Sequence, residues 1–159
     1  GSVVGHELTH GFDNNGNRFD GNGNWHNWWE PETRREFEER SKCFVKQYSA
    51  ERFEQVHLNV NGLRTLAENI ADNVGLKQSF QAYRKHLQTH GDEPRTPLVD
   101  QLTNEQLFFI GFAQPLCGYA KPENLENYLL TNPHSPGSTR VKFVLANQPE
   151  PTIARSAPL

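Results

Sequence analysis

The sequence predicts a mainly α-helical domain with little β-strand. Apolar residues recur at helical spacing over long stretches, most clearly from about Thr65 to His90. Runs rich in Gly, Asn and Pro separate these stretches, and such residues favour turns and loops. The 159 residues fit one ordinary domain, which we expect to cover residues 1–148 and to be followed by an unpatterned tail at 149–159.

The first predicted helix covers residues 3–12. Val3, Val4 and Leu8 recur through it at helical spacing, so we expect the helix to be half buried. Gly and Asn residues with interleaved tryptophans follow from 13 to 29, a composition that suits a loop or a short hairpin.

Two longer helices are predicted in the middle of the chain. Pro31 begins an amphipathic helix over about 32–48, in which Phe37, Cys43, Phe44 and Tyr48 recur at roughly helical spacing among charged residues. The run at 60–63 is a turn signal, and the long helix over 65–90 follows it.

The last third of the chain combines helix caps with a proline-rich loop. Thr103 and Gln106 have the spacing of a capping box, and the apolar run behind them predicts a helix buried almost all round, which Pro115 ends or bends. Residues 132–137 predict a loop, after which Ser138 can cap a short helix.

Charge and composition exclude several classes of partner. A formal net charge of −3 suggests neither nucleic acid nor an anionic membrane surface as a partner. No stretch approaches the roughly 20 apolar residues needed to span a bilayer, so we expect this segment to be soluble and to make no membrane contact. Because the sequence contains no Met, we expect it to be a piece of a longer protein.

The run His6-Glu7-Leu8-Thr9-His10 indicates a metal site. On a helix, two histidines four residues apart point to one face and can bind one metal ion, with the glutamate beside them. The alternative is a helix face with two solvated histidines. A ligand role fits better, because a metal satisfies imidazoles that are otherwise costly to bury.

Glu68 is the candidate for the third ligand that a catalytic zinc site requires. Glu68 and Asp72 are four residues apart on the long predicted helix, so their like charges call for a cation opposite them. Asp72 can then accept the free N–H of a zinc histidine, and Asp13 can do the same for His10. Alternatively, Glu68 completes a capping box with Thr65, and Asp72 is solvated.

Together these motifs resemble the neprilysin family of zinc endopeptidases, over about residues 1–147. The resemblance covers five stretches in the family's order, namely Val4–Asp13, Val60–Gly62, Glu68–Asn73, Glu105–Phe109 and His134–Gly137. It implies the catalytic part of such an enzyme, a thermolysin-like core with two active-site helices, further packing helices and little strand.

The resemblance also implies roles for the individual side chains. One zinc ion would be held by His6, His10 and Glu68, with Asp72 orienting the zinc histidine His6. Glu7 would act as general base on a zinc-bound water and return the proton to the leaving amine. His134 would stabilise the oxyanion, and Arg140 would hold a backbone carbonyl of the substrate.

At the level of the whole enzyme, the resemblance implies cleavage of oligopeptides on the amino side of hydrophobic residues. It also implies a location outside the cell, either on the plasma membrane or secreted. The N-terminal part of the parent enzyme would be a further partner, because in the family that region closes over the active site.

The sequence departs from the family in ways that leave alternatives open. It lacks the large N-terminal region, its tail differs, and Val74 stands where the family usually has glycine. Cys43 and Cys117 lack their family partners, so we expect both to be free. A zinc-binding but inactive remnant is therefore the main alternative to an active peptidase, and a metallohydrolase of another kind is the third.

Overall fold

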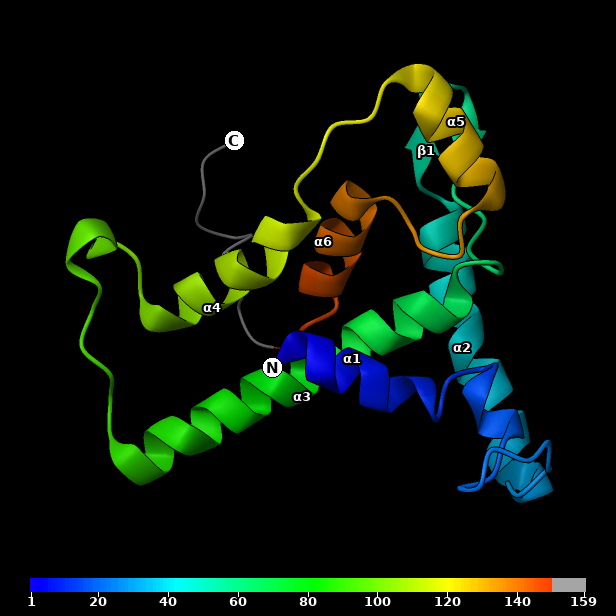
Figure 1. The fold of residues 1–159 in the computed structure, drawn as a ribbon, viewed down its shortest axis with the longest axis horizontal. Coiled ribbons are helices and arrows are strands. Elements are labelled where there is room, and N and C mark those ends of the chain that lie inside the picture. Colours follow the sequence, from blue (N-terminus) through cyan, green and yellow to red (C-terminus); the bar gives the residue numbers. More distant parts are fainter. Residues whose placement is uncertain (150–159) are drawn as a thin grey trace.

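The computed structural model describes residues 1–149, and this part of the chain is mainly helical (Figure 1). The predicted fold class is confirmed: six α-helices are joined by short 3-10 turns and one two-stranded antiparallel sheet. The helices are α1 (Ser2–His10), α2 (Pro31–Ser49), α3 (Leu66–His90), α4 (Asn104–Ala113), α5 (Pro122–Thr131) and α6 (Gly137–Ala146), and the strands are β1 (Arg52–Phe53) and β2 (Leu58–Asn59). The predicted tail lies outside the described residues, except for Pro149.

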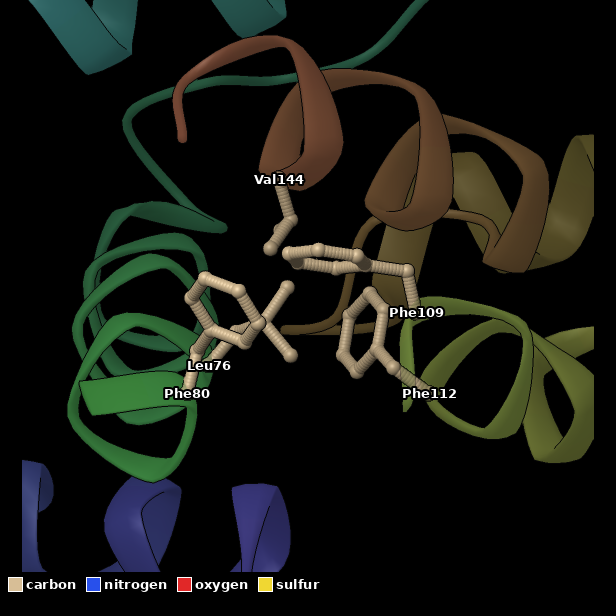
Figure 2. Packing of buried hydrophobic residues seen from close by; sticks show 5 residues of the cluster. All are labelled: Leu76, Phe80, Phe109, Phe112 and Val144. Carbon is tan, nitrogen blue, oxygen red and sulfur yellow. The ribbon is translucent and has the colours of Figure 1, made fainter. Parts of the chain in front are cut away.

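The main core lies where α3, α4 and α6 meet. Leu76 and Phe80, one turn apart on α3, pack against Phe109 and Phe112 of α4 and Val144 of α6 (Figure 2). Each of these side chains is at least 92% buried, and burying one such side chain contributes about 1.5–3 kcal/mol. This cluster therefore fixes α6 against the middle of α3.

Helix α4 begins as predicted but is less buried than predicted. The Thr103 side chain accepts the N–H of Gln106, and the Gln106 side chain accepts the N–H of Thr103, which confirms the capping box. The prediction of burial almost all round is wrong, because Ile110 is 41% exposed. Only one face of α4 contacts the core.

Helix α1 packs across α3 (Figure 1), and the residues that it buries in this contact are small. Its buried residues are Gly5 and Thr9, whereas Val3, Val4 and Leu8 are 64–70% exposed. The expectation that these three residues are buried is therefore wrong. The reason is close approach of the two backbones: a Cβ on Gly5 would lie 2.8 Å from the carbonyl oxygen of Gly75, and a Cβ on Gly75 would collide with the main-chain nitrogen of His6.

The C-terminal helices differ from prediction in two respects. Ser138 does not cap α6: the helix begins at Gly137 and its N-cap residue is Pro136, which has no side-chain hydrogen-bonding group. Helix α5 was not predicted at all, although Pro122 stands at its first turn, a favoured position for proline. Between α5 and α6 runs the loop that carries His134 (Figure 1).

Two further features concern the outside of the molecule. None of the helices within residues 1–149 is long and apolar enough to cross a membrane. Within the described residues, Cys43 and Cys117 are both free and exposed.

Candidate metal centre and active site

Three predicted ligands converge where α1 crosses α3. His6 and His10 lie one turn apart on α1, and their Nε2 atoms are 3.0 Å from each other. Glu68, in the first turn of α3, places its Oε2 atom 3.2 Å from Nε2 of His6 and 3.6 Å from Nε2 of His10. One ligand atom from each residue thus lies in a single small cluster.

This cluster fits a tetrahedral zinc ion. Zinc ligands at about 2.0–2.2 Å in tetrahedral arrangement are separated from one another by about 3.3 Å, which lies within the observed range of 3.0–3.6 Å. Oε2 of Glu68 is buried and has no hydrogen-bond partner among the described residues, although a buried carboxylate oxygen normally requires one. A cation at this point would satisfy it.

The alternative interpretation of Glu68 as a capping residue finds no support in the structure. Thr65 is the N-cap residue of α3, but its side chain makes no cap hydrogen bond. Its hydroxyl instead donates to the carbonyl oxygen of Asn61 and accepts from the side chain of Asn69. Glu68 is thereby left directed toward the two histidines.

Carboxylates hold the outer nitrogen of each histidine ring. Nδ1 of His6 lies 2.9 Å from Oδ1 of Asp72, and Nδ1 of His10 lies 2.6 Å from Oδ2 of Asp13. Such a bond places the ring proton on Nδ1 and leaves Nε2 as the metal-binding atom. Asp13 is itself fixed, because its other oxygen accepts the main-chain N–H groups of Asn15 and Gly16.

Arg140 completes the surroundings of Asp72. Its Nε and Nη2 atoms donate to the two carboxylate oxygens at 2.6 and 2.8 Å. Burial opposes ionisation of Asp72, but the hydrogen bonds from Arg140 and His6 outweigh it and lower the pKa of this carboxyl group. The like charges of Glu68 and Asp72 are therefore balanced, as expected, by cationic and proton-donating groups opposite them.

The negative charge around His6 favours a bound cation. The hydrogen bond to Asp72, and then the carboxylate of Glu68 next to the ring, raise the pKa of His6 to about 9. The pKa of Glu68 is lowered, because the nearby histidines outweigh the effect of its burial. Carboxylates that stabilise a proton on this ring also stabilise a metal ion beside it.

A pocket of about 230 Å³ opens beside this cluster. His6, Glu7, Asp72, His134 and Arg140 line it, together with apolar residues of α1 and of the segment around Pro115. Nε2 of His134 is 3.1 Å from Oε2 of Glu68. The structure thus brings His134 and Arg140 to the same site, although both are more than 60 positions from Glu68 in the sequence.

Sequence analysis did not predict the buried polar residues that hydrogen-bond next to this site. Asn69 and Ser135 are fully buried and hydrogen-bond to each other, and Asn132 contacts His134. Asn69 and Ser135 stand inside motifs that carry the family resemblance. Their position directly after Glu68 and His134 in the sequence was the feature from which they could have been predicted.

Comparisons with known proteins show the family to which the chain belongs. The model of peptidase family M13 matches residues 1–153. Neprilysin-1 of Caenorhabditis elegans is 50% identical over 151 residues, covering 94% of this chain and 20% of that protein. Neprilysin-11 of the same organism is 46% identical over 147 residues, covering 92% of this chain and 17% of that protein. The chain therefore spans about a fifth of the length of these curated relatives.

Solved structures show the same arrangement of helices. The zinc metalloprotease Zmp1 of Mycobacterium tuberculosis, in complex with an inhibitor, superposes with a TM-score of 0.82 at 34% identity, covering 92% of this chain and 22% of that one. A galactose-containing glycoprotein complex of Haemonchus gives a TM-score of 0.81 at 37% identity, covering 93% and 24%. The chain belongs to peptidase family M13, as its neprilysin-like motifs indicated.

Proposed function

We propose that this chain forms the zinc-binding catalytic part of a metalloendopeptidase that hydrolyses oligopeptides. The observation that carries the proposal is the convergence of His6, His10 and Glu68 on one point, with a buried carboxylate oxygen that has no hydrogen-bond partner in the described part of the chain. These three residues would hold one zinc ion. A bound zinc ion would polarise the scissile carbonyl group of the substrate and lower the pKa of a bound water to roughly 7.

Glu7 is the general base in this proposal. It follows His6 directly on α1, is exposed, and lines the pocket beside the ligand cluster. Its carboxylate can take the proton of the attacking water and then deliver it to the leaving amine. Neither step requires a covalent acyl-enzyme.

His134 and Arg140, which line the same pocket, would bind the substrate. His134 can donate a hydrogen bond from Nε2 to the oxygen that becomes negative as water attacks, and such a donor contributes about 2.7–4 kcal/mol in comparable sites. Asp72 engages Nε and Nη2 of Arg140, so the Nη1 amino group would be the one to donate to a backbone carbonyl of the peptide.

The proposal includes the setting of the parent enzyme. Peptides would be the substrates, and the N-terminal part of the longer protein would be a partner. The lengths of the curated relatives support such a partner, since they are about five to six times as long as the stretch matched here. The extracellular location and the preference for hydrophobic residues stay predictions from the resemblance.

The proposal can be tested by comparing the chain with Glu7→Gln for zinc content and for cleavage of a quenched fluorescent peptide. We expect one zinc per chain in both proteins, and a kcat about 10²–10⁴-fold lower in the variant because it lacks the general base. Zinc without cleavage in the parent chain would favour the alternative, an inactive zinc-binding remnant. Absence of zinc from both would overturn the ligand assignment.

A further inference from the structure

Two fully buried polar side chains stand next to residues of the proposed site without a role in its chemistry. Asn69 follows Glu68 on α3, and Ser135 follows His134 in the loop between α5 and α6. Both side chains are 0% exposed. The Ser135 hydroxyl donates to Oδ1 of Asn69 at 2.8 Å, so a buried hydrogen bond joins the backbone segments that carry Glu68 and His134.

The hydrogen bond belongs to a relay in which each donor has an acceptor. Nδ2 of Asn69 donates to the hydroxyl of Thr65 at 2.8 Å, and that hydroxyl donates to the carbonyl oxygen of Asn61 at 3.1 Å. This fixes the orientation of the Asn69 amide, with its oxygen toward Ser135. Satisfied buried networks of this kind are rigid, because any rearrangement would leave a polar group unpaired away from water.

The loop around His134 is held at its main chain, while the ring reaches the pocket. Oδ1 of Asn132 accepts the main-chain N–H of His134 at 2.8 Å and lies 3.1 Å from Nδ1 of the ring. The Tyr128 hydroxyl donates to the carbonyl oxygen of Ser135 at 3.4 Å. The His134 side chain itself remains 39% exposed, so its position depends on the residues that flank it.

We propose that the Asn69–Ser135 hydrogen bond is a positioning element that keeps His134 in register with Glu68. This inference rests on the proposed function, in which the zinc held by Glu68 and the donor on His134 must reach the same carbonyl oxygen. Reacting groups tolerate little misplacement, and an error of about 1 Å can cost 10²-fold in rate. A side-chain bond one residue from each group controls their separation more directly than the distant core does.

The first test measures the position of His134 directly, in the zinc-loaded chain. Ser135→Ala removes the donor, and Thr139→Val is the matched control, because Thr139 is also 0% exposed and its hydroxyl has no partner among the described residues. We expect Ser135→Ala to shift and broaden the ring Cε1–H resonance of His134, while zinc content stays at one per chain and the control leaves the resonance unchanged. An unchanged resonance in Ser135→Ala would overturn the proposal. If alanine prevents folding, Ser135→Cys keeps a side chain there with a weaker donor.

The second test is kinetic and separates positioning from general stability. Ser135→Ala should lower kcat about 10- to 100-fold with KM changed less than about two-fold, because the interaction with His134 is made in the transition state. In a His134→Ala background the same substitution should have no further effect. An equal loss in both backgrounds would show that Ser135 does not act through His134. If the parent chain cleaves nothing, the proposed activity of this chain fails, whereas the resonance comparison still decides the positioning role.

Discussion

At the scale of single residues, Asp72 connects the proposed zinc ligand His6 to Arg140, the proposed substrate-binding residue. One of its oxygens contacts both His6 and Arg140, and the other contacts Arg140 alone. The side chain is 4% exposed, so removing its charge leaves two cationic or proton-donating groups without their acceptor. In the proposed site, its role would therefore be to hold a zinc ligand, His6, and a substrate-binding group, Arg140, in a fixed relative position.

We expect Asp72→Asn to lower zinc affinity about 10- to 100-fold, which is typical when the carboxylate partner of a metal-binding histidine is lost. The folded state should also lose about 3–5 kcal/mol, because Arg140 is left partly buried and unpaired. Zinc titration and urea unfolding would measure the two effects. Asp13→Asn is the matched variant, since Asp13 holds His10 but contacts no arginine in the described residues. Equal losses of stability in both variants would contradict this role of Arg140.

Much of the site could be predicted residue by residue, and the exception has a physical reason. The spacing of His6 and His10 predicts that they share one helix face. Glu68 and Asp72, two negative charges one turn apart, predict a positive group opposite them. A buried hydrogen bond between residues far apart in the sequence, such as Asn69 and Ser135, cannot be predicted from the spacing of residues. His134 and Arg140 could be assigned only through the family resemblance, because a loop histidine and a helix arginine are usually surface residues.

At the scale of secondary-structure elements, the contact of α1 with α3 sets the distance between the two histidines on α1 and Glu68 on α3. Gly5 precedes His6 directly, and Gly75 lies one turn beyond Asp72. Neither position has room for a Cβ, so the two helix backbones touch. A larger separation would move both histidines away from Glu68 together.

We expect Gly75→Ala to weaken zinc binding at least 10-fold and to destabilise the fold by about 1–3 kcal/mol, the usual cost of overpacking. Gly111→Ala is the control, since Gly111 lies inside α4 and a Cβ there meets nothing within 4 Å. That variant should gain up to about 1 kcal/mol from higher helix propensity. Thermal melting with and without zinc would separate the two variants, and normal zinc affinity in Gly75→Ala would exclude the proposed role of the contact.

The elements themselves were predicted to differing extents. Helix α3 was predicted almost to its ends, and it continues unbroken through Val74, where the family usually has glycine. The sheet β1–β2 was not predicted, because strands of two residues are too short to show alternation. The burial of α1 was mispredicted because glycine carries no apolar signal, yet glycine permits the closest packing.

At the scale of the whole molecule, the proposed ligand group of His6, His10 and Glu68 joins α1 to α3, which the main core does not do. The main core binds α3 to α4 and α6, while α1 contributes no residue to that cluster. A zinc ion held by two residues of α1 and one of α3 would therefore add a cross-link outside the core. Metal binding to the native state alone also stabilises it by mass action.

We expect removal of zinc with EDTA to lower the melting temperature. At a free zinc concentration of 100 times Kd the metal contributes about 2.7 kcal/mol, which corresponds to roughly 5–10 °C for a domain of this size. Glu68→Gln should show a smaller difference between the zinc-loaded and EDTA-treated forms, since a neutral oxygen binds the cation less well. Calorimetry of both proteins would measure these differences in melting temperature. A parent chain that melts at the same temperature with zinc and with EDTA would refute zinc stabilisation.

The exposed thiols of Cys43 and Cys117 have a consequence for handling the molecule. They stand on separate elements, so each chain offers two points for disulfide formation with its neighbours. In air, such a bifunctional monomer grows into linear oligomers, not merely dimers. Thiol reductants would prevent this but also bind zinc, since thiolate sulfur is a strong zinc ligand. A phosphine reductant, or the double substitution of both cysteines by serine, keeps oxidation and metal loss from being confused.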